Sequence, residues 1–130
     1  LEKEGGALGK MLPIFRSGLG GPIGTGMQWM SWIHRTDLCE IIDNAISNKN
    51  WSGTFNAVSP QPISMKQFSE TLGQVLHRPT ILKVPAPILR LLLGDGAKVV
   101  LEGQKVISIR LKKLGFEFLY PEILGALKTL

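Results

Sequence analysis

Apolar residues recur at intervals of three and four in several parts of the chain, which is the pattern of amphipathic helices. With Thr36 or Asp37 as N-cap, one such stripe predicts a helix that ends at the polar segment 47–53. The apolar positions on it, which we expect to be buried, are Leu38, Ile41, Ile42, Ala45 and Ile46. Cys39 lies in the same stretch, so we expect an inert, packed thiol.

The segment after residue 62 carries the clearest signal for the start of a helix. Ser64 and Gln67 have the spacing of a capping box, and Ile63 and Phe68 stand where a hydrophobic staple places its two residues. Pro79 closes this helix. Its apolar stripe is Met65, Phe68, Leu72, Val75 and Leu76.

Shorter elements are predicted along the rest of the chain. Apolar runs bounded by turn residues predict strands at Thr54–Val58, Thr80–Pro85 and 116–118. Further helices are predicted at Pro87–Leu93, from Asp95 through Leu101, between Ser108 and Gly115, and at the C-terminal end with Pro121 in the first turn. The class is α/β, with strands too few and too scattered to complete a doubly wound sheet.

Length and composition narrow the class of protein. The chain has 130 residues, 44% hydrophobic and 19% charged, which is typical of one globular domain with its own core. Its longest apolar run, Val84–Leu93, contains Arg90 and is shorter than the roughly 18 residues of a membrane-spanning helix. A single cysteine excludes an intrachain disulfide and a multi-cysteine zinc site. The first residue is Leu1 rather than methionine, so we expect a piece of a longer chain.

The net charge of +5 is carried entirely by residues 61–130, because residues 1–60 contain equal numbers of basic and acidic side chains. Only Glu102 opposes the closest cluster of cations, which consists of Lys98, Lys105, Arg110, Lys112 and Lys113. This cluster is either a solvated face or a surface for an acidic ligand or partner. No aromatic residues alternate with it as nucleic-acid stacking requires, so we expect no nucleic-acid partner.

Five glycines crowd the segment SGLGGPIGTGMQWMSWIH, and three of them, Gly18, Gly20 and Gly24, form a near miss to a dinucleotide fingerprint. Such a fingerprint lies between a strand and a helix N-terminus, which holds the pyrophosphate. Here Pro13 lies in the preceding segment, and the residues after the loop read as extended. The pattern favours a surface loop or substrate-side flap, with a cofactor or phosphate loop as the weaker alternative.

A complete catalytic constellation is missing from the sequence. The single tyrosine, Tyr120, is followed four residues later by Leu124, so Tyr-x-x-x-Lys does not occur. His34 and His77 have no metal-ligating partner at helical spacing, and no metal site is predicted. His34 beside Asp37 is either an acid–base pair or a structural histidine bonded to the start of a helix. We therefore predict no catalytic residue in this chain.

The motif QWMSWIHRTDL resembles the aromatic-Ile-His-x-x-Asp-Leu segment of the extended short-chain dehydrogenase/reductase superfamily. FNAVSPQPISMKQF, LLLGDGAKVVLEGQKV and LGFEFLYPEILGAL narrow the resemblance to NAD(P)-dependent epimerase-family proteins. Members of this subgroup end in a domain of unknown function and are sometimes labelled cell-division-inhibitor-like. The resemblance covers nearly the whole chain.

This resemblance implies the C-terminal fragment of a Rossmann-type protein with a small, mainly helical domain on the substrate side. Residues 1–59 would be the remnant of the Rossmann domain, including the glycine-rich cleft loop, and residues 60–130 the smaller domain. A helix at Glu4–Arg16 would follow a strand that ends near Leu1, and Trp32–His34 would continue the Rossmann side. The cofactor loop and a catalytic Tyr/Lys pair would lie upstream, with NAD or NADP bound there and none expected for the fragment alone.

The resemblance also implies where a small-molecule substrate would lie. The cleft candidates are Gly20, Gly21, Gly24, Gly26, Gln28, Trp29 and His34. Met30 stands where many nucleotide-sugar epimerases have a phosphate-binding arginine, which argues against a nucleotide-sugar substrate.

A competing hypothesis is a non-catalytic interaction module with a division-related role. Its surface would consist of Lys105, Arg110, Lys112 and Lys113. Either hypothesis places the protein off the membrane, in the cytoplasm or, in a plant, the plastid stroma.

Overall fold

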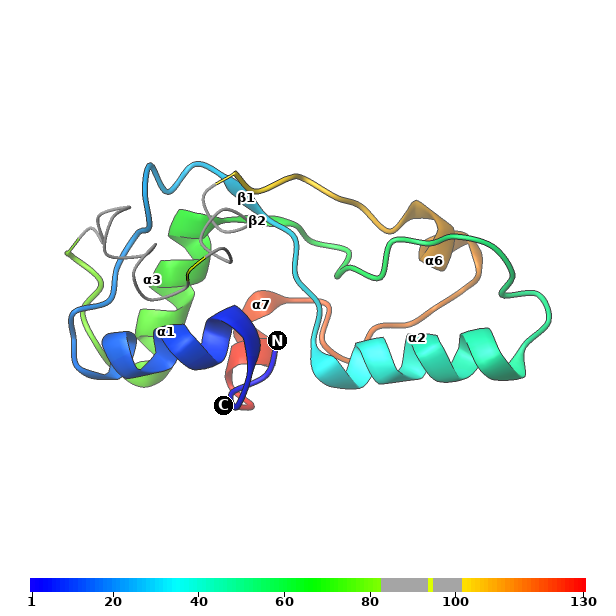
Figure 1. The fold of residues 1–130 in the computed structure, drawn as a ribbon, viewed down its shortest axis with the longest axis horizontal. Coiled ribbons are helices and arrows are strands. Elements are labelled where there is room, and N and C mark those ends of the chain that lie inside the picture. The colour runs from blue at the N-terminus through cyan, green and yellow to red at the C-terminus, as the bar shows by residue number, and fades with distance from the viewer. Residues whose placement is uncertain (83–93, 95–101) are drawn as a thin grey trace.

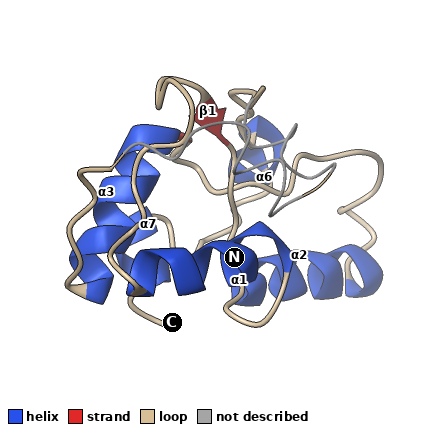
Figure 2. Cartoon of the chain, turned by 60° about the vertical axis from the view of Figure 1, so that its left-hand side comes forward, coloured by secondary structure: helices blue, strands red, loops and turns tan. Residues whose placement is uncertain are grey.

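The computed structural model describes residues 1–82, 94 and 102–130. Its helices are α1 (Gly6–Arg16), α2 (Arg35–Ser47), α3 (Met65–Leu76), α6 (Ile109–Lys113) and α7 (Ile123–Leu127). Two short strands, β1 (Trp29–Met30) and β2 (Ile63–Ser64), pair antiparallel with Trp29 opposite Ser64. Helices α1, α3 and α7 gather at one end of the molecule, whereas α2 and α6 lie at the other (Figure 1). Figure 2 shows how loops, rather than sheet, fill much of the space between the helices.

The main core lies where α3 packs against α1 and α7. Its buried members are Leu8, Met11, Leu12, Phe15, Ile23, Trp32, Ile63, Met65, Phe68, Leu72, Ala126 and Leu127. These residues come from both sides of the predicted division between residues 59 and 60, so one core joins the two parts. The division into a Rossmann remnant and a smaller domain stays a prediction.

Helix α3 begins as its sequence predicts. The Ser64 hydroxyl accepts from the backbone N–H of Gln67 at 3.2 Å, and the Gln67 side chain accepts from the Ser64 N–H at 3.1 Å, which completes the capping box. Ile63 and Phe68, the expected staple residues, are both buried in the main core. The helix ends at Leu76, before Pro79, and its C-cap His77 has a left-handed φ of 53°.

The predictions for α2 are partly wrong. The helix ends at Ser47 as expected, but its N-cap is His34 rather than Thr36 or Asp37. Of the predicted buried stripe, Ile41 is buried, whereas Ala45, Ile42 and Ile46 are exposed. Cys39, expected to be packed, is also exposed. The apolar stripe is wider than the surface that α2 buries among the described residues. Ile41 faces that surface, whereas the other three side chains point away from it.

A second core, next to α2, explains why 116–118 is not the expected strand. Trp51 is buried against Ile41 and Leu111, and Phe116 meets its ring edge-on at a centroid distance of 5.8 Å. Phe118 meets Phe116 in the same way at 4.8 Å. Aromatic packing, rather than strand pairing, therefore fixes this segment.

The strand expected at Thr54–Val58 is also absent. The carbonyl oxygen of Thr54 accepts from the Arg110 guanidinium at 3.1 Å, and the N–H of Val58 donates to the nearby Asn56 carbonyl. These backbone groups are thus satisfied by a side chain and a local turn instead of a neighbouring strand.

The other short elements meet different outcomes. Residues 80–82 are not in a strand, and the remainder of that expected strand lies outside the described residues. The helices expected at Pro87–Leu93 and from Asp95 through Leu101 lie there as well. Between Ser108 and Gly115, the expected helix is confirmed as α6. Pro121 precedes α7 instead of standing in its first turn.

Leu1 lies beside the segment that leads into α2. Its backbone nitrogen donates to the carbonyl of Ile33, and its own carbonyl accepts from the N–H of Arg35 at 3.3 Å. Ile33 and Arg35 are the two neighbours of His34 in the chain. In a parallel pair of strands, one residue bonds in this way to both neighbours of the residue opposite it. The extended segment before α2 thus makes two backbone bonds of the parallel type with Leu1, although it is not a strand of the described sheet. Its place in a Rossmann sheet stays a prediction.

Candidate functional site

The glycine-rich loop between α1 and β1 owes two of its glycines to close packing. A Cβ atom on Gly20 would lie 2.5 Å from Cγ of Phe15, and one on Gly21 would lie 1.8 Å from the carbonyl oxygen of Leu82. Both glycines are buried. Their lack of a side chain is thus explained by neighbouring protein atoms, without a ligand.

The second half of this loop is tied to the start of α3. Gly24 and Gly26 have φ values of 58° and 73°, which favour glycine. The carbonyl of Gly26 accepts from the N–H of Lys66, and that of Gln28 accepts from the N–H of Met65, each at 2.9 Å. A helix N-terminus binds an anion through such N–H groups. Because the loop carbonyls already occupy them, the described residues offer no pyrophosphate cradle here.

Gln28 and Trp29, the next candidates, lie where the loop enters β1. The Gln28 amide donates to the carbonyl of Ile23 at 2.9 Å and accepts from the Thr25 hydroxyl at 3.1 Å, so this side chain braces the loop. Trp29 is 38% exposed, and Met27 beside it is 74% exposed. The extended conformation predicted after the loop is confirmed at β1.

The free side of β1 is covered by residues 103–106, more than 70 positions along the chain. The Ser31 hydroxyl donates to the carbonyl of Gln104 at 2.7 Å and accepts from the N–H of Val106 at 3.0 Å. A Cβ atom on Gly103 would lie 1.7 Å from the carbonyl oxygen of Trp29. These roles of Ser31 and Gly103 were not predicted from the sequence, because no local sequence pattern indicates a contact between residues more than 70 positions apart.

His34 is the N-cap of α2, which bears out its structural interpretation. Its Nδ1 accepts from the N–H of Thr36 at 3.2 Å, so the proton resides on Nε2, which donates to the Thr129 hydroxyl at 3.1 Å. That hydroxyl donates in turn to the carbonyl of Ala126. The imidazole also packs against the ring of Tyr120, with the centroids 3.9 Å apart and the ring planes tilted by 39°.

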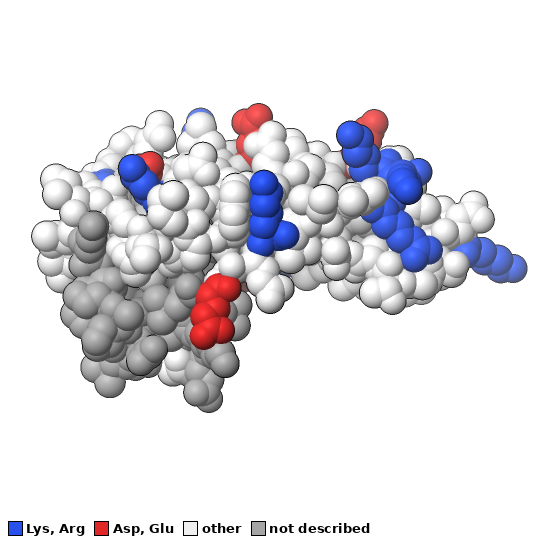
Figure 3. Space-filling view, turned by 90° about the horizontal axis from the view of Figure 1, so that it is seen from above, with Lys and Arg blue, Asp and Glu red and all other residues white. Residues whose placement is uncertain are grey.

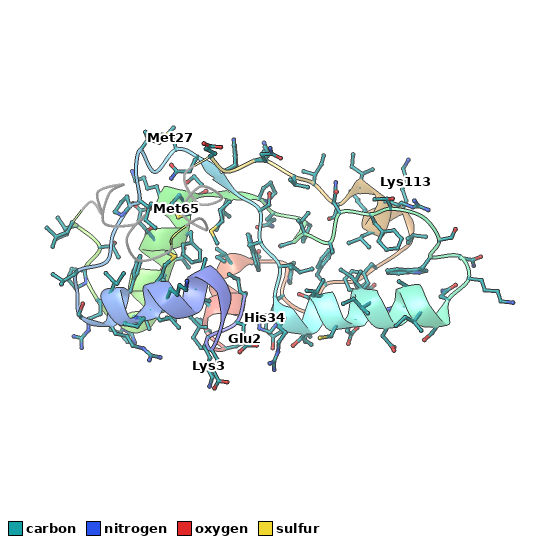
Figure 4. All side chains as sticks on the ribbon, viewed as in Figure 1. Glu2, Lys3, Met27, His34, Met65 and Lys113 are labelled. Carbon is teal, nitrogen blue, oxygen red and sulfur yellow. The ribbon has the colours of Figure 1, made fainter. Side chains whose placement is uncertain are left out.

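A pocket of about 260 Å³ opens beside His34, between the chain's first residues and its last turn. It is lined by Leu1, Glu2, Lys3, His34, Arg35, Thr36, Ala126, Thr129 and Leu130. Figure 4 shows Glu2, Lys3 and His34 near one another there, and Glu2 forms an ion pair with Arg35 at 2.8 Å. Burial lowers the pKa of His34. This pocket contains none of the glycine-loop candidates, so the structure separates His34 from them.

Asp37, considered as a partner for His34, has a different role. Its side chain is 1% exposed, and its two oxygens accept from the backbone N–H groups of Leu119, at 2.7 Å, and Tyr120, at 3.2 Å. The acid–base pair is therefore not formed. Asp37 instead fastens the segment before α7 to the start of α2. Within residues 1–82, 94 and 102–130, no group of three or more His, Cys, Asp or Glu side chains is arranged to hold a metal ion.

The four cations of the predicted partner surface do not act alike. Arg110 donates to the carbonyls of Ser52 and Thr54 and lies over the ring of Phe55, so it clamps a loop. Lys112 and Lys113 are exposed on α6. Figure 3 shows basic side chains gathering toward that end of the molecule.

Lys105, the fourth cation, lies over the indole of Trp29, with its Nζ 4.2 Å from the ring centroid. A predicted partner-surface residue thus contacts a predicted cleft residue. None of the described helices is both long and apolar enough to cross a bilayer.

The sequence of this chain is similar to those of several known proteins. Residues 84–130 match a family model described as a domain of unknown function, DUF1731. The chain is 48% identical over 130 residues to "Epimerase family protein SDR39U1 homolog, chloroplastic" of Arabidopsis thaliana and 40% identical over 131 residues to "Epimerase family protein SDR39U1" of Homo sapiens. All of this chain aligns, but it spans only 38% and 45% of those two proteins.

Solved structures agree with the sequence relatives. The human epimerase family protein SDR39U1 (isoform2), whose crystal structure is described as containing NADPH, superposes on 99% of this chain with a TM-score of 0.91 and 39% identity. A nucleoside-diphosphate sugar epimerase from Corynebacterium glutamicum superposes on 97% with a TM-score of 0.67 and 28% identity. The chain covers 44% and 23% of these two structures. Over its whole length, the chain is thus similar in sequence and in fold to the C-terminal part of epimerase family proteins.

Proposed function

We propose that this chain forms the substrate-side wall of an NAD(P)-dependent, epimerase- or dehydratase-like oxidoreductase. The observation that carries the proposal is the TM-score of 0.91, over 99% of the chain, with a human protein described with NADPH. The start of α3, where the glycine-rich loop meets a helix, offers no pyrophosphate cradle, because its first N–H groups bond to loop carbonyls. The proposal therefore assigns cofactor binding to the part of the relatives that this chain does not span.

Within that wall, the glycine-rich loop and β1 present a rigid surface to a small molecule. The loop is fixed by bonds to α3, and Gln28 braces it from within. Trp29 and Met27 supply an exposed apolar surface at its end. Rigid placement of such groups positions a substrate at low entropic cost. The substrate-cleft role of Gly20, Gly21, Gly24, Gly26, Gln28 and Trp29 remains part of this proposal. So does that of His34, which would contact a ligand from its separate pocket.

A chimera tests the proposed function. Residues 1–130 replace the matching 131-residue segment of human SDR39U1, and NADPH binding is followed by fluorescence titration. The chimera is expected to bind NADPH within about tenfold of the human protein, whereas the 130-residue chain alone binds none at the same concentrations. A chimera that folds, as judged by circular dichroism, but leaves NADPH free contradicts the proposal. Micromolar binding by the chain alone contradicts it as well.

The interaction module is a second candidate, supported by the exposure of Lys112 and Lys113 on α6. Reversing both to glutamate in the chimera separates the two functions: NADPH binding is expected to stay unchanged, and capture of an acidic partner protein to be lost. We place the protein in the cytoplasm or the plastid stroma, the latter in line with the chloroplastic relative. The division-related role belongs to this second candidate.

A further inference from the structure

Lys105 lies over Trp29 at a place where neither residue is needed for the core. Its ammonium nitrogen is 4.2 Å from the centroid of the indole, within the range of a cation–π contact. Trp29 is 38% exposed, and Lys105 is exposed too. The ring therefore fixes the position of a charge that remains accessible to solvent.

The backbone around Lys105 is held against β1 on both sides. Ser31 bonds to the carbonyl of Gln104 and to the N–H of Val106, the two neighbours of Lys105 in the chain. Gly103 packs on the carbonyl of Trp29 so closely that any side chain would collide with it. These contacts fix the backbone of Lys105, and the indole fixes its ammonium group. Less side-chain entropy is therefore lost when the ammonium binds a ligand.

The charge of Lys105 is not neutralised by a described carboxylate. The ion pairs within residues 1–82, 94 and 102–130 join Arg35 to Glu2 and Lys66 to Glu70, and neither includes Lys105. An ammonium group has three N–H donors, and the indole face engages its charge without offering a conventional acceptor atom. Lys105 thus keeps donors available for an anion approaching from solvent.

We propose that Lys105, held over Trp29, binds an oxyanion group of the small-molecule substrate, either a phosphate or a carboxylate. The inference rests on the proposed function, since it assigns the anion to a substrate of the same cleft. The indole, and the exposed Met27 two positions before it in the chain, would contact an apolar or planar portion of that molecule. The cleft accordingly takes an anionic substrate with a flat or apolar part.

The test uses the chimera saturated with NADPH, so that added anions cannot report on the cofactor site. Sodium phosphate and sodium acetate are titrated separately, at constant ionic strength set with sodium chloride. The readout is the indole N–H resonance of Trp29, assigned by its loss in Trp29→Phe. One of the two anions is expected to shift this resonance saturably, which distinguishes a phosphate from a carboxylate ligand.

Matched variants assign the effect to Lys105. Lys105→Gln is expected to weaken anion binding about tenfold or more, the loss expected for one hydrogen bond to a charged group. Lys105→Arg should retain binding, and Lys112→Gln, which removes an exposed cation elsewhere, should leave it unchanged. Gly103→Ala keeps the lysine but displaces its segment, so it too should weaken binding.

Two results overturn the inference while NADPH binding, and with it the proposed function, stands. One is that neither anion moves the Trp29 resonance, and the other is that Lys105→Gln binds as tightly as the unmodified chimera. A failure of the chimera to bind NADPH instead removes the proposed function. The same titration on the 130-residue chain then decides whether Lys105 and Trp29 bind an oxyanion on their own.

Discussion

Asp37 shows how one buried carboxylate can replace several weaker contacts. Its oxygens accept hydrogen bonds from the backbone N–H groups of Leu119 and Tyr120. These two residues lie in a segment that is not part of a strand, so no neighbouring strand pairs with it. Because a carboxylate offers acceptor sites on both oxygens, one side chain satisfies two backbone donors. The sequence position of this acid predicts a helix N-cap, but the neighbouring His34 takes that place and leaves Asp37 to fasten the C-terminal segment.

Replacing this carboxylate is therefore expected to destabilise the fold. Asp37→Ala leaves two partly buried N–H groups without their acceptor and should lower the free energy of unfolding by about 1 to 3 kcal/mol. Urea denaturation of the chimera measures the change. Asp43→Ala, at an exposed position on the same helix, is the control and should change the free energy by less than about 0.5 kcal/mol. Equal effects of the two substitutions would show that the Asp37 contacts do not stabilise the fold.

His34 gives the fold a defined dependence on pH. Burial lowers the pKa of its imidazole below the ordinary value of 6.5, so the folded state binds this proton less readily than the unfolded state. Neutral His34 therefore contributes its full stabilisation to the folded state at a pH above the pKa of the histidine in the unfolded chain. This contribution is lost as the pH falls from that pKa toward the lower pKa of His34 in the folded state. Protonation also removes Nδ1 as the acceptor for Thr36.

We expect the melting temperature of the chimera to fall between pH 7.5 and pH 5.5 by more than that of its His34→Asn variant. Asparagine can still cap the helix, but it does not titrate in this range. Differential scanning fluorimetry at matched ionic strength provides the comparison. Parallel pH curves for the two proteins would exclude His34 as the source of the dependence.

At the scale of an element, the glycine-rich loop is explained by packing and backbone conformation. Gly20→Ala would press a methyl group into the Phe15 ring, which is part of the main core, and should lower the free energy of unfolding by about 1 to 3 kcal/mol. Gly125→Ala in α7 meets no atom within 4 Å and should instead stabilise its helix by about 0.5 to 1 kcal/mol. Urea denaturation measures the change in the free energy of unfolding for each variant. Changes of opposite sign would confirm that the position of the glycine, and not its replacement as such, decides the effect.

Elements specified by their own sequence could be predicted, and those specified by distant contacts could not. The capping box and staple at the start of α3 depend on residues within five positions of one another, and they form as predicted. The segment Thr54–Val58 has the composition of a strand, but its backbone bonds to Arg110, more than 50 positions away. For the same reason the sequence suggested Trp29 and Lys105 for two different surfaces, whereas the fold brings them together.

At the scale of the whole molecule, α2 exposes a broad apolar surface at the edge of the described fold. Ile42 is 50% exposed and Ile46 80% exposed, and Cys39 lies on the same side of the helix. Exposed apolar surface of this kind marks a face that packs against another part of a protein. We expect this face to pack against the part of the epimerase family relatives that this chain does not span.

Thiol labelling measures whether this face is covered. In the 130-residue chain, Cys39 should react with a maleimide at close to the rate of an exposed thiol, whereas in the chimera it should react at least about tenfold more slowly. The control is a chimera with a cysteine introduced at Ser47, the exposed last residue of α2, and with its other cysteines replaced by serine. This cysteine should label quickly.

A substitution on the same face provides a second measurement. Ile46→Glu should lower the melting temperature of the chimera but not that of the chain alone, because only the chimera buries that side chain against apolar neighbours. If Cys39 labels equally fast in both proteins, the cofactor-binding part does not cover α2, and the apolar face must be assigned to a different partner.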